Sequence, residues 1–337
     1  MSPSMSPDMN PNISPEVDPA LTREIEDAAV AMAWGAGDIL SRYFAGDLSQ
    51  NLSIEYKDKK QQDPVTSADK ATQSYLVEEI SRRFPDHGIL GEEDAPVDST
   101  EGETDDPAPD FLWVLDPLDG TTNFLNGLPI YASSIGVMYR GWPLVGALYL
   151  PWPNPKGGFV LHCRRGGGCF ADGKPVSVFQ AEDTPGGPAQ QPVANRLIGL
   201  PGYFSQGMKF SKQIKGSPGE LRTTGSIAYE LGMTACGVLQ YAVIGAPKLW
   251  DMLAGVLAVQ EAGGTVMIRL PGEKRRNPMG SLAPGWEERP PSLKQLRGRV
   301  WPLVAGNRQL APLIANSMRR RFQPLTQLKR LWRKVAK

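Results

Sequence analysis

The chain has 337 residues, 41% of them hydrophobic, so it can bury one large core or two smaller ones. Lys plus Arg equals Asp plus Glu at 36 each, which argues against a whole-molecule charge that would favour nucleic acid or a membrane as partner. Two histidines and three cysteines leave little material for a metal centre of imidazole or thiolate ligands, so oxygen atoms must hold any metal.

The first part of the chain predicts a leader followed by a long helix. Residues 1–19 are rich in Pro, Ser, Met and Asn and lack the apolar core of a signal peptide, so we predict a disordered leader. From Leu21 to Tyr43 apolar residues recur at nearly helical spacing, and Gly46 then marks a stop. No apolar run reaches the roughly 20 residues that cross a bilayer, and we expect a cytoplasmic protein.

A second helix and a buried strand are predicted next. Ser67 and Asp69 are both good N-caps for a helix that ends before Pro85. Residues 95–109 contain three prolines and many acids, which predicts a surface loop. Residues 111–115 form a continuous apolar run bounded by turn formers, a pattern typical of a buried strand.

The middle of the chain predicts an antiparallel sheet. Apolar or alternating runs separated by Gly and Pro cover residues 130–139, 143–150 and 158–163. Glycine-rich turns at residues 166–168 and 171–174 predict hairpin corners after the third run. Together with the two helices, these strands predict an N-terminal α+β subdomain over residues 20–180.

Beyond a Pro-, Gly- and Gln-rich stretch after residue 180, helix and strand are predicted to alternate, which favours an α/β layer over residues 181–318. The predicted order is helix 226–236, strand 239–244, helix 251–262, strand 265–270 and strand 300–304. Residues 271–299, with prolines, glycines and mixed charges, are predicted as an insertion.

Charge is unevenly distributed along the chain. From Glu92 to Asp110 there are nine acidic side chains and no basic one, which makes this region a candidate cation site. After Glu288 there are thirteen basic side chains and no acidic one. The basic tail, residues 319–337, is predicted as a solvated terminal helix, with contact to an anionic membrane surface or a partner protein left open.

Asp116 and Asp119 are the strongest candidates for chemistry. They lie three apart on a predicted tight turn after a buried strand, where Pro117 restricts one φ angle and Gly120 frees another. Such a turn can aim both carboxylates and the carbonyl of Leu118 at one point, a set of hard oxygen ligands suited to Mg²⁺. Taken alone, a D-P-L-D-G pentapeptide is more often an ordinary surface turn.

The residues after this turn suit a phosphate group. Gly120, Thr121 and Thr122 offer backbone N–H groups and two hydroxyls at a predicted helix start. Metal and phosphate would then be neighbours, as metal-assisted phosphoryl chemistry requires.

The motifs resemble those of the inositol monophosphatase family, within the lithium-sensitive, metal-dependent phosphatase superfamily that also includes fructose-1,6-bisphosphatase and 3′(2′),5′-bisphosphate nucleotidase. The resemblance covers residues 21–315 and implies a layered αβαβα sandwich with the metal site at the junction of its two halves. The matching blocks are residues 63–69 (D-P-V-T-S-A-D), 91–93 (G-E-E), 113–124 with D-P-L-D-G-T-T-N-F, and 250–264 with W-D-x-x-A-G.

This resemblance implies the metal ligands. Glu92, Asp116 and the Leu118 carbonyl would hold a first Mg²⁺, and Asp116 would bridge to a second ion completed by Asp119 and Asp251. Glu92 would also serve a weaker third ion. The implied cofactor is therefore two or three Mg²⁺ ions, with inhibition by Li⁺.

The resemblance also implies the catalytic and phosphate-binding residues. Thr121, hydrogen-bonded to Asp69, would orient and help to deprotonate the attacking water. Gly120, Thr121 and Thr122 would hold the phosphate of a small phosphorylated metabolite. A homodimer is common in the family that the chain resembles.

The substrate is where the resemblance weakens. Inositol-specific members place an acidic residue seven positions before the last metal-ligating Asp, and Ile244 stands there in this chain. Ser226 and Ile227 are candidate substrate-lining residues. An inositol monophosphate-like ester is our first expectation, and fructose 1,6-bisphosphate, 3′-phosphoadenosine 5′-phosphate and histidinol phosphate are alternatives.

Two other functions are alternatives. A haloacid-dehalogenase-type phosphatase needs two acids two residues apart, but Pro117 stands two before Asp119, which disfavours an aspartyl nucleophile. A catalytically silent metal- or phosphometabolite-binding protein would keep the fold without turnover. Cys163 and Cys169 are predicted as core or hairpin thiols, with a redox-sensitive pair as the alternative.

Overall fold

The computed structural model describes residues 14–45, 53–56, 64–93, 106–153, 157–180 and 191–321. The first half of the chain forms a seven-stranded sheet whose strands, in spatial order, are β3 Gly88–Gly91, β4 Phe111–Asp119, β5 Ala132–Tyr139, β6 Trp142–Leu150, β7 Phe159–Arg164, β8 Gly168–Ala171 and β9 Lys174–Pro175. β3 runs parallel to β4, and the later neighbours are antiparallel. The predicted strands and both hairpin corners are confirmed.

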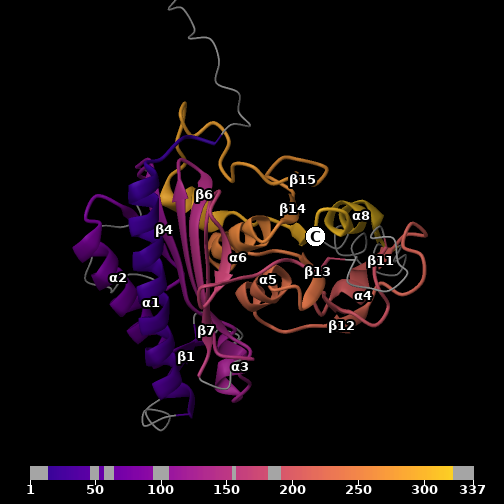
Figure 1. Cartoon of the computed structure of the whole chain (residues 1–337), viewed down its shortest axis with the longest axis horizontal. Coiled ribbons are helices and arrows are strands. Elements are labelled where there is room, and N and C mark those ends of the chain that lie inside the picture. Colours follow the sequence, from indigo (N-terminus) through magenta and orange to yellow (C-terminus); the bar gives the residue numbers. More distant parts are fainter. Residues whose placement is uncertain are drawn as a thin grey trace, which may run out of the picture.

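Two long helices cover one face of this sheet (Figure 1). Helix α1 spans Pro19–Ala45 and contacts β5, β6 and β7, while helix α2 spans Ser67–Arg83 and contacts β4. The apolar side chains Ile25, Met32 and Leu40 of α1 are fully buried, as their helical spacing predicts. Helix α1 begins within the predicted leader, and residues 1–13 lie outside the described part of the chain.

The second half forms a six-stranded mixed sheet. Its strands, in spatial order, are β12 Glu220–Arg222, β10 Leu197–Gly199, β13 Leu239–Ile244, β16 Leu303–Asn307, β14 Gly264–Ile268 and β15 Asn277–Pro278. β10 is parallel to β12 and β13, whereas β16 is antiparallel to β13 and β14. The strand predicted from residue 300 begins instead at Leu303, because Pro302 has no N–H to give to a ladder.

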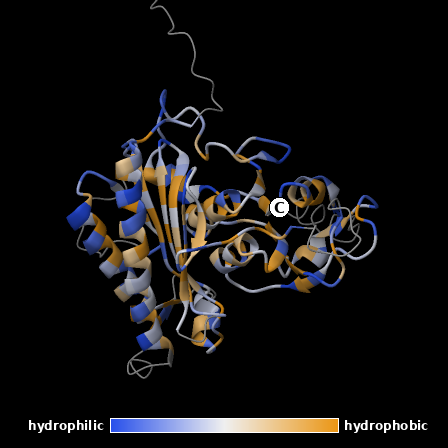
Figure 2. Cartoon of the chain, in the orientation of Figure 1, coloured by the Kyte–Doolittle hydropathy of each residue, from blue (hydrophilic) through white to orange (hydrophobic). Residues whose placement is uncertain are grey.

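Helices α5 (Ile227–Ala235) and α6 (Leu249–Glu261) lie between the two sheets, and α8 (Leu310–Ser317) packs on the far side of the second sheet (Figure 1). Three clusters of buried apolar residues fill the spaces between these layers. Figure 2 shows the large sheet as mostly hydrophobic and the outer helix α2 as mostly hydrophilic. The architecture is therefore the layered αβαβα sandwich implied by the sequence motifs.

Short elements complete the fold. β1 (Ile54–Tyr56) pairs with β2 (Pro64–Thr66), and β11 (Met208–Phe210), which is contacted by helix α4 (Phe204–Gly207), pairs with β17 (Met318–Arg320). The predicted basic tail therefore begins inside a strand of the second half, and residues 322–337 lie outside the described residues. No helix in the described ranges is long and apolar enough to cross a membrane.

The predicted insertion, residues 271–299, contacts the first sheet. It carries β15 and the short helix α7 (Leu293–Gly298). Pro107, before β4, forms a β-bridge with Ser292. The N–H of Leu282 donates a hydrogen bond of 2.8 Å to the carbonyl oxygen of Gly141, in the turn between β5 and β6. The segment therefore links the two halves of the chain.

Cys163 and Cys169 face each other across β7 and β8. Both are free thiols in the buried core, and burial raises the pKa of Cys163. A buried neutral thiol packs as a small apolar side chain.

Candidate functional site

The end of β4 departs from the turn that the sequence predicts. The strand does not end at Leu115 but continues to Asp119, and its pairing with β5 shifts between Asp116 and Asp119. Three residues of β4 advance against two of β5, from Ser134 to Ala132, so the strand contains a one-residue bulge. Residues three apart in a regular strand point to opposite faces, and the bulge allows both carboxylates to approach the same place.

Gly120 connects this strand to helix α3 (Thr121–Leu125). It has a φ of 93°, and a Cβ there would lie 3.0 Å from the Ile130 carbonyl oxygen and from the Ser226 Cβ. Glycine is therefore required for both conformation and space. Thr122, the next but one residue, is exposed.

Asp69, on helix α2, is the hydrogen-bond partner of the Thr121 hydroxyl. Its helix is capped by Thr66 rather than by Ser67 or Asp69, and Asp69 is the third helical residue of a capping box. Its Oδ2 accepts hydrogen bonds from the N–H of Thr66 at 2.8 Å and from its hydroxyl at 2.5 Å. The other oxygen, Oδ1, is left to accept from the Thr121 hydroxyl at 3.4 Å, and that hydroxyl also lies 3.1 Å from the Leu118 carbonyl oxygen.

Burial changes the acidity of Asp69. The residue is fully buried, and this desolvation raises its pKa to about 6, although the hydrogen bonds from Thr66 act in the opposite direction. The nearby charge of Glu92 raises it further. A carboxylate with this pKa can take up a proton near neutral pH.

Asp251 and Asp119 are each held by a helix start. Helix α6 begins at Leu249, two residues before the predicted position, and the N–H of Lys248 donates to Asp251 Oδ2 at 2.7 Å. Asp119 Oδ2 accepts from the Ser226 hydroxyl at 2.8 Å and from the N–H of Ala228 at 2.5 Å. These bonds tie the carboxylates to the helices between the sheets.

Glu92 follows β3, the neighbour of β4. Its N–H donates to the Leu115 carbonyl at 3.0 Å, and its own carbonyl accepts from Arg297 Nη1 at 3.2 Å. Its carboxyl group shares a hydrogen bond with Asp116.

The four predicted acids influence one another electrostatically. Asp116 is 1% exposed, and burial raises its pKa well above the ordinary range, with the charges of Glu92, Asp119 and Asp251 adding to the rise. Burial also raises the pKa of Asp119 to about 7 and that of Asp251 well above its usual value. The structure therefore brings together acids that lie far apart in the sequence.

Comparison with known proteins shows which family the chain belongs to. A family model described as "Inositol monophosphatase family" matches residues 21–314, which is most of the chain. The chain belongs to the inositol monophosphatase family. It is accordingly a phosphatase, of a family that depends on Mg²⁺.

Relatives in this family have several names. The fructose-1,6-bisphosphatase/inositol-1-monophosphatase of Aquifex aeolicus is 30% identical over 72% of this chain and 85% of its own length. The Nus factor SuhB of Pseudomonas aeruginosa is 32% identical over 71% of this chain and 83% of its own length. The chloroplastic phosphatase IMPL1 of Arabidopsis thaliana is 33% identical, but the match spans only 55% of that protein and 63% of this chain.

Solved structures in the family share the fold. The extragenic suppressor protein suhB from Bartonella henselae superposes with a TM-score of 0.62 at 23% identity, covering 87% of this chain and 97% of that one. An IMPase/NADP phosphatase complexed with Mg²⁺ and phosphate gives a TM-score of 0.60 at 18% identity, and the match covers 87% of this chain and 95% of that one.

The donor set fits Mg²⁺ by its chemistry. Carboxylate and carbonyl oxygens are the ligands that this hard cation prefers. Burial, together with the repulsion between the acids, raises their pKa values, and a bound cation would offset both effects. Among the described residues, no three His, Cys, Asp or Glu side chains lie close enough together to hold a metal ion as they stand.

Sequence reasoning missed Arg297 and Lys248. Arg297, from α7, contacts the Glu92 carbonyl and lies 5.4 Å from the centre of the Trp250 ring. Lys248 lies 5.9 Å from the same ring, and its ammonium donates to the Arg297 carbonyl at 3.0 Å. Arg297 belongs to the predicted insertion, residues 271–299, and no sequence motif there indicates that it contacts the site.

Replacing Arg297 with Met should raise the Mg²⁺ concentration for half-maximal activity about tenfold, because residues that orient metal ligands support metal affinity. The measurement is an Mg²⁺ titration of activity and, separately, of the melting temperature. Lys294→Met, an exposed site on α7, is the matched control. Equal Mg²⁺ dependence in both variants would show that Arg297 does not position Glu92.

Proposed function

We propose that the chain hydrolyses the phosphomonoester of a small metabolite by attack of a water molecule, using two or three Mg²⁺ ions. The observation that carries this proposal is Asp116, which is 1% exposed and is surrounded by the charges of Glu92, Asp119 and Asp251. Leu118 would add its carbonyl oxygen. When bound, Mg²⁺ supplies polarisation of the phosphoryl oxygens and a lower pKa for a coordinated water.

The chain's own residues would orient the water and take up its proton. The Thr121 hydroxyl can donate to Asp69 or to the Leu118 carbonyl, which leaves its lone pairs to receive a hydrogen bond from the water. Asp69, with a pKa near 6, can accept the proton through Thr121. One water is consumed, and the alcohol and inorganic phosphate are released.

The phosphate would lie beside Gly120, Thr121 and Thr122, which follow directly on the last acid of β4. Support comes from the position of these N–H groups next to the carboxylates, because a bound cation and an anionic phosphate attract each other.

The substrate class is supported by related proteins. Staphylococcus aureus SaIMPase-II has been crystallised with inositol monophosphate and with 2′AMP, and the Aquifex relative is named for both fructose 1,6-bisphosphate and inositol monophosphate. We infer a small phosphorylated metabolite. The homodimer and the cytoplasmic location stay predictions.

The test is phosphate release from inositol 1-phosphate, fructose 1,6-bisphosphate, 3′-phosphoadenosine 5′-phosphate and histidinol phosphate, each with Mg²⁺ and with excess chelator. We expect turnover of at least one ester, lost on chelation and restored by Mg²⁺. Turnover that survives chelation would contradict the proposed site. No turnover with Mg²⁺ would favour the catalytically silent binding protein.

A further inference from the structure

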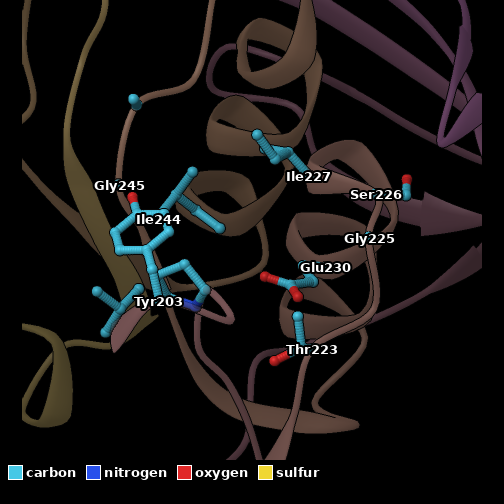
Figure 3. Close-up of a pocket in the computed structure, with 11 residues that line it drawn as sticks. Tyr203, Thr223, Gly225, Ser226, Ile227, Glu230, Ile244 and Gly245 are labelled. Atoms are coloured by element: carbon cyan, nitrogen blue, oxygen red, sulfur yellow. The ribbon is translucent and has the colours of Figure 1, made fainter. Parts of the chain in front are cut away.

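A cavity of about 340 Å³ lies at the end of β14. Arg269 and Arg299 line it together with Glu273 and with apolar side chains, among them Leu270 and Val300. None of its lining residues belongs to the cavity of about 290 Å³ that Figure 3 shows at the end of β13. The volume is within the range of small-molecule sites, about 300–1,000 Å³.

Backbone pairing brings a third arginine, Arg276, to the same place. Strands β14 and β15 are antiparallel with Ile268 opposite Asn277, so the next position outward sets Arg269 opposite Arg276. On the other side of β14, the N–H of Arg269 donates to the carbonyl of Pro302 at 3.0 Å. Like charges directly opposite each other on neighbouring strands are destabilising unless an opposite charge neutralises them.

The three arginines are held at this place without a carboxylate partner. Arg269, Arg276 and Arg299 are each half-buried, whereas Lys274 and Arg275 are exposed. Among the residues that the structure describes, no ion pair joins any of the three to a carboxylate, and the Nε of Arg276 is buried without a hydrogen-bond partner. Burial lowers the pKa of Arg276, and the charge of Arg269 lowers it further. A partly desolvated, unpaired guanidinium costs free energy, which a bound anion would offset.

Glu273 opposes this positive charge weakly. Its side chain is exposed, and its Oε2 accepts from the N–H of Leu270 at 3.2 Å. Among the described residues that line the cavity, the two arginines outweigh this one acid, and Arg276 adds a further positive charge beside them. The balance of charge therefore favours an anion.

We propose that this cavity binds the phosphate group of a small molecule, with the guanidinium groups of Arg269, Arg276 and Arg299 donating to its oxygens. A guanidinium presents paired N–H donors in a plane, a geometry that matches phosphate oxygens. Leu270 and Val300, which is 40% exposed, offer an apolar surface to the body of a phosphate ester. The site needs no metal ion, which distinguishes it from the carboxylates at the end of β4.

The experiment measures binding of inorganic phosphate to the chelator-treated protein by titration calorimetry at low ionic strength. Without Mg²⁺ the acids of the metal site repel an anion, so binding reports on the arginines. We expect saturable binding by the wild type, and Arg276→Met should weaken it about tenfold or more, because a charge-assisted hydrogen bond is lost. Arg275→Met removes an exposed charge from the adjacent position and, as the matched control, should change the affinity less than about twofold.

Two further readouts have a predicted sign. Glu273→Gln keeps an acceptor for the N–H of Leu270 but loses the charge, so it should tighten phosphate binding about twofold or more. Without phosphate, Arg276→Met should melt no lower than the wild type, because methionine removes an unpaired charge. Added phosphate should then raise the melting temperature of the wild type more than that of the variant. If Arg276→Met does not fold, Arg299→Met should show the same loss of affinity.

Phenylphosphonate, which carries a phosphate-like group on a ring, distinguishes two sources of the ligand. Tighter binding than that of inorganic phosphate would identify a phosphate monoester, and binding no tighter would identify phosphate itself; both outcomes support the site. Equal losses of affinity in Arg276→Met and Arg275→Met would reduce the effect to general charge and overturn the inference. Phosphate binding that neither Arg276→Met nor Arg299→Met weakens, or no binding by the wild type, would also overturn it.

Discussion

Asp116→Asn is expected to lower Mg²⁺-dependent phosphate release by about 10³-fold or more, since a catalytic metal supplies several kcal/mol of charge stabilisation in the transition state. Asparagine has the same shape and keeps an acceptor for the N–H of Leu118, which lies 3.1 Å from Asp116 Oδ1. It lacks the negative charge that we assign to binding two cations. The measurement is kcat across an Mg²⁺ titration, with circular dichroism to verify the fold.

The same substitution should stabilise the protein when no metal is bound. Burial raises the pKa of Asp116 in the folded state, so ionisation of this carboxyl destabilises the fold as pH rises from the unfolded value of about 3.9 toward the folded one. Asparagine does not titrate. The metal-free variant should therefore melt above the metal-free wild type at pH 8, and the difference should shrink toward pH 4.

Mg²⁺ should reverse this order, because a ligand that binds only the folded state raises its stability by mass action. The wild type should gain melting temperature with Mg²⁺ and the variant should gain little. Asp106→Asn, at an exposed position before β4, is the control and should behave as the wild type. Near-native activity of Asp116→Asn would refute its assigned role in metal binding.

Local patterns predicted most helices and strands and marked Asp116 and Asp119 as candidates, whereas the layered sandwich and the roles of Glu92 and Asp251 were implied by the resemblance to a family. Apolar runs bounded by Gly and Pro predicted β5 to β7, and D-P-L-D-G marked Asp116 and Asp119 as candidate metal ligands from the sequence alone. The bulge at Asp116 and Asp119 was not predicted, because it is a property of the pairing with β5 rather than of β4 alone.

Contacts between distant segments explain what the sequence could not show. Arg297 donates to the carbonyl of Glu92 across 205 positions of sequence, from a segment whose composition indicated only an insertion. Glu230 follows the predicted helix start at Ser226, and in the sequence it is an ordinary helical acid. In the structure it lines a cavity together with Tyr203 and Ile244, which come from other segments of the chain. A residue of this kind acquires its chemistry from neighbours that no local window contains.

Asp69→Asn should lower kcat by about 10²–10⁴-fold, the range of general acid–base catalysis, with a much smaller change in KM. Asparagine can still accept from Thr66, so helix α2 keeps its cap, but it cannot take up a proton through Thr121. In the wild type, activity should rise with pH as the carboxyl, with a pKa of about 6, ionises, and the variant should lose this acid limb.

The pH profile separates a base from a residue that only positions Thr121. A positioning role would lower kcat at every pH and keep the limb near pH 6, whereas loss of the base removes the limb itself. Thr121→Ser, which retains the hydroxyl, should keep the limb, and Thr121→Val should abolish it together with most of the activity. Asp86→Asn, an exposed acid just after α2, controls for the loss of charge. If Asp69→Asn kept the acid limb, the proton would have to leave by a route other than Thr121 and Asp69.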